Sequence, residues 1–151
     1  MTVSQLLRLL VDHKAKFVVI GAYALPAHGY SRSTYDIDIF YEPTKANIKR
    51  VIEALKECGY LAVEDLTEEQ LTKKKTLFRQ YVLDTDIHPF VAGVTFADVW
   101  KTKRETKIEG VKVYVPSLDN LIAMKKAAGR TKDLADLEYL EEIKKQTTKR
   151  K

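Results

Sequence analysis

The sequence predicts a single α/β domain with a small mixed β-sheet, backed by helices on one side and open on the other at a group of acids. Its 151 residues suit one domain with a hydrophobic core. Short apolar runs typical of strands alternate with segments of helical period. The sequence contains neither an internal repeat nor a low-complexity linker. We therefore expect residues 1–146 to form the domain and residues 147–151 to form a basic, disordered tail.

The first sixty residues predict helices alternating with strands. An amphipathic helix capped by Thr2 or Ser4 precedes an apolar strand that we expect to be buried on both faces. The next helix contains Pro26, which limits it to a turn or two. A second strand and a helix that stops at Gly59 follow. The expected elements are Val3–Lys14, Phe17–Ile20, Ala22–His28, Tyr35–Tyr41 and Pro43–Glu57.

The rest of the chain predicts further strands, a hairpin and more helices. Thr67-Glu68-Glu69-Gln70 is typical of a helix start. Valines alternate after Glu109-Gly110, which indicates a hairpin with its turn at that pair. The expected elements are the strands Tyr60–Val63 and Leu77–Phe90, a helix at Thr95–Trp100, the hairpin Arg104–Val115, a helix from Ser117 to Gly129 and a last helix at Asp133–Gln146.

Composition indicates the cellular environment of the protein more than it indicates a reaction. A net charge of +5 and a pI near 9.2 suit an anionic substrate such as a nucleotide or RNA, and equally suit plain solubility. The single cysteine, Cys58, excludes an internal disulfide, fits a reducing cytosol and is expected to be an inert thiol. No signal peptide is present, and no apolar run approaches the ~20 residues that span a bilayer. We expect a cytoplasmic protein without membrane contact and leave its oligomeric state open.

Acids alternate with apolar residues in Asp36-Ile37-Asp38-Ile39. Side chains two apart on a strand share a face, so Asp36 and Asp38 stand side by side while the isoleucines face the core. Two adjacent carboxylates are usually held by a cation between them or by a proton on one of them. The alternative is a solvated strand face that carries two acids by chance.

Gly21-Ala22 follows the first apolar strand and opens a short helical segment. A strand, a glycine and a helix start form a backbone arrangement that offers N–H groups to a phosphate. A phosphate cradle beside paired metal carboxylates is what nucleotidyl transfer needs.

Gly21-Ala22 and Asp36-Ile37-Asp38, at this spacing, resemble the DNA polymerase β-like nucleotidyltransferase superfamily. The longer stretch GAYALPAHGYSRSTYDIDIF, with its His28-Gly29, looks like the minimal nucleotidyltransferases of the AbiEii toxin and MNT antitoxin-type group. The resemblance implies a polymerase β palm-like fold and its strand order. One departure is Ala22, which stands where the family has Gly or Ser, so a serine hydroxyl for the triphosphate is missing.

A third carboxylate is implied by the same resemblance. Asp84, Asp86 and His88 alternate in the strand-like run and would share one face. Asp86 best resembles the family's third acid, and Asp84 is the second choice or a turn residue between two strands. We expect His88 to be a rim or capping histidine rather than a metal ligand, because Mg²⁺ prefers oxygen.

The C-terminal helices carry cations that also resemble the family. Lys125, Arg130 and Lys132 are implied to lie near the triphosphate, where they would supply positive charge. The alternative is a solvated basic face with Asp133 as a helix N-cap.

The resemblance implies transfer of a nucleoside monophosphate from an NTP to an acceptor hydroxyl, with Mg²⁺ or Mn²⁺. Asp36, Asp38 and Asp86 would bind metal and act in catalysis, whereas Gly21, Ala22, Arg32, Lys125, Arg130 and Lys132 would bind the nucleotide. The acceptor is expected to be RNA such as tRNA, a partner protein or a small molecule, and a toxin–antitoxin system is one setting for it. One alternative is a catalytically impaired regulator, which Ala22 favours. The other is an RNA-binding module, and against it the aromatic residues lack the spacing of a base-stacking platform.

Overall fold

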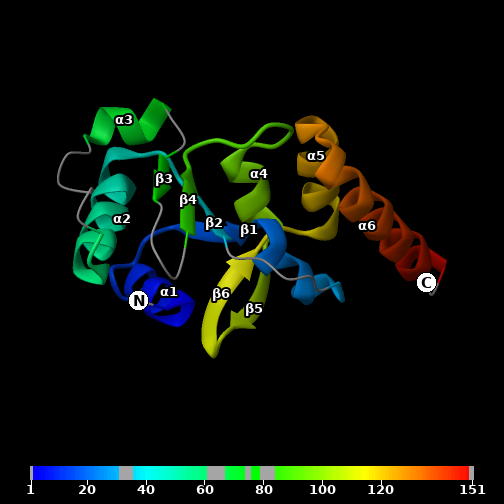
Figure 1. Cartoon of the computed structure of the whole chain (residues 1–151), viewed down its shortest axis with the longest axis horizontal. Helices are drawn as coiled ribbons and strands as arrows, with labels where there is room; N and C mark the ends of the chain where they lie inside the picture. Colours follow the sequence, from blue (N-terminus) through cyan, green and yellow to red (C-terminus); the bar gives the residue numbers. More distant parts are fainter. Residues whose placement is uncertain (1, 31–35, 61–66, 74–75, 79–83, 150–151) are drawn as a thin grey trace.

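The computed structural model describes residues 2–30, 36–60, 67–73, 76–78 and 84–149 (Figure 1). Among the described residues, four strands form the main sheet and two form a hairpin, and the other elements are helices. In chain order the elements are α1 (Val3–Asp12), β1 (Phe17–Ile20), the 3₁₀ helix η1 (Gly21–His28), β2 (Asp36–Tyr41), α2 (Lys45–Cys58), α3 (Glu68–Lys73), β3 (Thr76–Phe78), β4 (Asp84–His88), α4 (Phe96–Lys101), β5 (Arg104–Ile108), β6 (Val111–Val115), α5 (Leu118–Ala128) and α6 (Thr131–Lys149).

The main sheet is mixed, with the strand order β1-β2-β4-β3. The central strand β2 runs antiparallel to β1 and parallel to β4, and β3 runs antiparallel to β4. Ile37 and Ile39 of β2 are fully buried, as their alternation with the acids predicts. The predicted α/β class with a small mixed sheet is confirmed.

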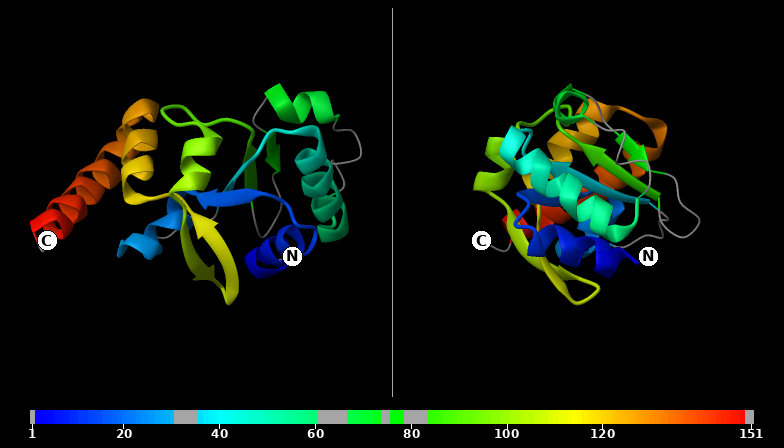
Figure 2. Two further views of the ribbon diagram at one scale, coloured as in Figure 1. Left: turned by 180° about the vertical axis from the view of Figure 1, so that it is seen from behind. Right: turned by 90° about the vertical axis from the view of Figure 1, so that its left-hand side faces the viewer.

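Local signals account for the ends of the first helices. Thr2 caps α1 in a reciprocal capping box with Gln5, and Thr44 caps α2 by accepting a hydrogen bond from the Asn47 amide. Gly59 ends α2 with a φ of +96°, a value that favours glycine. Helices α1 and α2 pack against each other (Figure 2), and the buried leucine stripe of α1 joins the core.

The hairpin of β5 and β6 turns at Glu109-Gly110 as predicted, and both turn residues have positive φ. Such a pair of left-handed residues matches the twist of the strands on either side. The valines of β6 are buried and the strand packs beside β1, so the hairpin supports the main sheet without sharing its hydrogen bonds.

Helices α5 and α6 form a pair at the C-terminal end of the chain, and α6 projects from the body of the molecule (Figures 1 and 2). Ser117 caps α5 as expected, and Gly129 ends it. Helix α6 begins at Thr131 and runs to Lys149, which is longer at both ends than the predicted Asp133–Gln146. Within the described residues, no helix combines the length and apolarity that a membrane span requires.

The structure refines three further sequence predictions. The strand expected at Leu77–Phe90 is two antiparallel strands, β3 and β4, and Asp84 is the first residue of β4. The helix expected after Gly21 is a 3₁₀ helix, with Pro26 inside it. Tyr60 belongs to no strand, and the remainder of its predicted strand lies outside the described residues.

Candidate active site

The register between β2 and β4 brings the predicted acids together. Asp38 lies opposite Asp86, and Asp36 lies opposite Asp84. Neighbouring strands are about 4.8 Å apart, whereas residues two apart on one strand are separated by about 6.6 Å. Asp86 is therefore the acid of β4 that stands beside Asp38. It is also buried, with 7% of its surface exposed, whereas Asp84 is half-buried.

His88 joins this pair. One ligand atom from each of Asp38, Asp86 and His88 can be chosen so that all lie within 4.8 Å of one another. The His88 Nε2 atom is 2.9 Å from Oδ1 of Asp38. The sequence predicts a rim or capping histidine rather than a metal ligand, and the structure places the His88 ring against the Asp38 carboxylate. Its alternation with Asp84 and Asp86 is the signal for this placement, because it puts all three side chains on one face.

Gly21 lies against the side chain of Asp38. It directly follows Ile20, the residue of β1 that lies opposite Asp38. A Cβ atom at position 21 would stand 2.5 Å from Oδ2 of Asp38, and the φ of Gly21 is +69°. Both the close approach and the left-handed backbone require glycine here. The next residue, Ala22, is buried.

The donor set fits a divalent cation. Two carboxylates and one imidazole converge, and the missing Cβ of Gly21 keeps the space beside Asp38 open. Carboxylate oxygen suits Mg²⁺ and Mn²⁺. Imidazole binds transition metals more readily than it binds Mg²⁺. Asp36 lies one pleat earlier on the same face of β2 and does not belong to this three-residue group of described residues.

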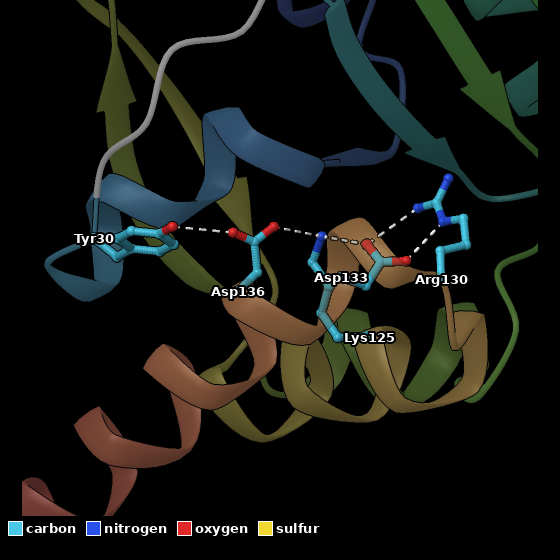
Figure 3. Close-up of polar contacts among 5 residues, drawn as sticks. All are labelled: Tyr30, Lys125, Arg130, Asp133 and Asp136. Carbon is cyan, nitrogen blue, oxygen red and sulfur yellow. Dashed lines mark hydrogen bonds and ion pairs between the residues drawn. The ribbon is translucent and has the colours of Figure 1, made fainter.

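Lys125 and Arg130 belong to an ionic network around two buried aspartates, Asp133 and Asp136 (Figure 3). Lys125 Nζ is 3.0 Å from Asp133 Oδ1 and 3.2 Å from Asp136 Oδ2. Arg130 donates from Nε to Oδ2 of Asp133 over 2.6 Å. The hydroxyl of Tyr30, just after η1, donates to Asp136 over 3.1 Å, so the network joins α5 and α6 to the segment that leads toward β2.

The two cations of this network differ in exposure. Lys125 is only 11% exposed, so its side chain does not belong to a solvated basic face, whereas Arg130 is 55% exposed. Asp133 lies inside α6 and binds Lys125 and Arg130, so it is not a helix N-cap. Burial alone would raise the pKa of the Asp133 carboxyl, but hydrogen bonds from Arg130 and Lys125 outweigh it and lower that pKa below its ordinary value.

Phosphate contact by Lys125 would have to compete with two carboxylates, while half-exposed Arg130 keeps part of its guanidinium toward solvent. Arg32 lies outside the described residues, and so does the side chain of Lys132. The sequence does not single out Tyr30, because its partner Asp136 lies more than a hundred residues further along the chain.

Comparison with solved structures supports the fold. The lincomycin-bound crystal structure of the lincosamide antibiotic adenylyltransferase LnuA is similar, with a TM-score of 0.61. The likeness covers 95% of this chain and 98% of that chain at 17% sequence identity, so it shows the fold alone. No curated protein matches the sequence.

Comparison with protein families extends over nearly the whole chain. Residues 1–147 match a family described as "Nucleotidyltransferase of unknown function (DUF6036)". The predicted nucleotidyltransferase identity is thereby confirmed. With its acids on β2 and β4 and this match over residues 1–147, the chain belongs to the DUF6036 family of nucleotidyltransferases.

Proposed function

We propose that the protein transfers a nucleoside monophosphate from an NTP to an acceptor hydroxyl, in the presence of Mg²⁺ or Mn²⁺. The observation that carries this proposal is the register of Asp38 opposite Asp86, with Gly21 against the Asp38 carboxylate. Carboxylates held this close in a partly buried place repel each other, and a bound cation removes that repulsion.

Asp38 and Asp86 would hold the metal, with Asp36 extending the site along β2 and His88 as a further donor. When bound, divalent ions would lower the pKa of the acceptor hydroxyl and neutralise the charge of the polyphosphate. Asp86 is also the candidate to accept the proton of that hydroxyl, because it is the acid buried beside Asp38.

The nucleotide would lie against the start of η1. The backbone after Gly21 offers N–H groups to the β- and γ-phosphates, and the buried methyl group of Ala22 offers no hydrogen bond to them. Arg130 is the first of the predicted C-terminal candidates for phosphate contact, since it is more exposed than Lys125. Arg32, Lys125 and Lys132 are lesser candidates for phosphate contact.

The decisive experiment is label transfer. Each NTP, labelled at the α-phosphate, would be incubated with the protein, Mg²⁺ or Mn²⁺ and cell lysate. Label that moves to an acceptor in the presence of one NTP identifies donor and acceptor together. Asp86→Asn should abolish transfer, while the control Glu53→Gln, which removes one exposed negative charge on α2, should retain it. Equal activity in both variants would exclude this site.

The acceptor panel should include RNA, protein and small molecules. The similar structure is titled an antibiotic adenylyltransferase, so ATP and hydroxyl-bearing small molecules belong in it. A toxin–antitoxin role and a cytoplasmic location stay predictions from the sequence.

The second candidate function is a regulator that binds nucleotide without turnover. The buried Ala22 favours it, because the hydroxyl that would help hold the triphosphate is absent. Nucleotide binding by calorimetry, with no label transferred to any acceptor class, would support this hypothesis.

A further inference from the structure

A cavity of about 450 Å³ lies at the opposite end of β1 from the acids. Its wall includes Phe17, which lies opposite Tyr41, whereas Ile20 at the other end of the strand lies opposite Asp38. Three residues of strand separate these two positions by about 10 Å. The cavity is therefore distinct from the candidate active site.

Four cations and no acid line this cavity among the described residues: Lys14, Lys16, Arg50 and Lys112. Lys16 contacts Glu42 and Lys112 contacts Glu105, each over 2.9 Å. In the described part of the chain, no ion pair or side-chain hydrogen bond occupies Lys14 or Arg50. The cavity consequently carries an excess of positive charge, contributed by three separate parts of the chain.

Aromatic rings hold part of this charge in place. Lys16 Nζ lies 5.0 Å from the centre of the Trp100 ring, and Lys103 Nζ lies 4.1 Å from it. Lys103 is also 4.9 Å from the ring centre of Tyr114, which lines the cavity with Trp100. Cation–π contacts orient an ammonium group without neutralising it. The rings thus fix the position of two ammonium groups at the edge of the cavity, while Lys14 and Arg50 supply its unpaired positive charge among the described residues.

The same contacts exclude one kind of recognition. The Trp100 ring stacks on Phe96 at 5.8 Å and meets Lys103, so it does not offer an open platform on which a base would stack. Recognition at this cavity depends on negative charge on the ligand rather than on base stacking.

We propose that the cavity binds the phosphate backbone of a single-stranded nucleic acid. Its volume falls within the range of about 300–1,000 Å³ in which proteins bind small ligands, enough for a nucleotide unit. Lysine is a point-charge partner for phosphate, and three of the four lining cations are lysines. The four cations come from α2, β6 and the segment between α1 and β1, so three separate parts of the chain supply charge for a polyanion. The inference does not depend on the proposed transfer, but if both hold, nucleic acid becomes the favoured acceptor class.

The test uses Trp100, the single tryptophan of the chain, as a reporter inside the site. A twelve-nucleotide single-stranded RNA of mixed sequence should change Trp100 emission saturably. The double variant Lys14→Gln, Arg50→Gln should bind it about tenfold more weakly at low salt, and its slope of log K against log salt should be smaller by roughly 0.7 for each phosphate that the variant no longer neutralises. The control Lys56→Gln removes one exposed cation of α2 outside the cavity and should bind like the unchanged protein.

Several results would overturn the proposal. Undiminished binding by the double variant, with its thermal transition unchanged, would exclude the cavity. Equally weakened binding by Lys56→Gln would indicate unspecific attraction to the whole charged surface. Competition by poly-glutamate of equal charge would assign the cavity to acidic peptides, and saturation by inorganic phosphate or a free NTP at the same affinity as the RNA would assign it to a small phosphate. None of these outcomes depends on catalytic activity, so failure here is distinguishable from failure of the proposed transfer.

Discussion

Gly21 lies so close to Asp38 that a Cβ atom there would stand 2.5 Å from the carboxylate oxygen Oδ2. Gly21 belongs to η1 and Asp38 to β2, so this contact sets the distance between the candidate phosphate cradle and the candidate metal site. Any side chain at position 21 must move Asp38 or the backbone of η1.

Gly21→Ala should therefore damage the site beyond its cost to the backbone. A left-handed alanine costs roughly 1 kcal/mol, and displacement of Asp38 should also weaken metal binding. Gly29→Ala is the matched control, because Gly29 also has a positive φ but its added Cβ would meet nothing within 4 Å. Urea denaturation and Mn²⁺ titration of both variants separate the two effects. Equal metal binding in both would contradict the proposed contact between cradle and metal site.

Asp86→Asn and Asp84→Asn should differ. Asp86 lies opposite Asp38 and is buried, so its replacement should abolish transfer while sparing much of NTP binding. Asp84 lies opposite Asp36, one pleat away, and its replacement should be milder. Single-turnover assays compare them. An inactive Asp84→Asn beside an active Asp86→Asn would move the catalytic assignment by two residues.

His88→Asn should weaken metal binding by about 10–100-fold, the range typical for partners that orient metal carboxylates. His88 contacts Asp38 over 2.9 Å, and asparagine is too short to restore the same contact from that position. Calorimetric titration with Mn²⁺ and with Mg²⁺ measures the effect. An unchanged affinity for both metals would return His88 to the rim role expected from the sequence.

Lys125→Met should destabilise the fold by about 3–5 kcal/mol, because it leaves two buried carboxylates without their shared cation. Both Asp133 and Asp136 are almost fully buried. Lys126→Met is the control, since Lys126 is the next residue of α5 but is largely exposed in its pair with Glu141. Chemical denaturation gives both free energies of unfolding. Equal free energies of unfolding for the two variants would mean that the network stabilises the fold no more than a surface ion pair does.

Acid should release part of the stability that Asp133 supplies. The pKa of its carboxyl is lowered in the folded state, so this stability is present above the ordinary value of 3.8 and is lost as pH falls through the lower folded pKa. Arg130→Gln removes the two guanidinium hydrogen bonds to Asp133 that help to lower its pKa, so acid unfolding of this variant should begin at higher pH. Circular dichroism against pH tests this, and coincident curves for the two proteins would contradict it.

The sequence alone determined those features that depend on nearby residues. Thr44 and Gly59 mark the ends of α2, Glu109-Gly110 marks the hairpin turn, and the alternation of Asp36 and Asp38 with isoleucine orients β2. Caps, turns and periodicity act over a few residues, so their signals are legible in a short stretch. The resemblance of Gly21-Ala22 and Asp36-Ile37-Asp38 to a known superfamily supplied the nucleotidyltransferase identity.

Only the tertiary structure decided which distant residues meet. Asp38 lies opposite Asp86 rather than Asp84 because of the register between β2 and β4. A shift of two residues along β4 would have placed Asp84 opposite Asp38 instead. The contact of His88 with Asp38 also depends on the pairing of β2 and β4, and the contacts of Lys125 with Asp133 and Asp136 depend on the packing of α5 against α6. Such contacts are selected by packing of the whole core and by the closing of long stretches of chain between the partners, which no local pattern encodes.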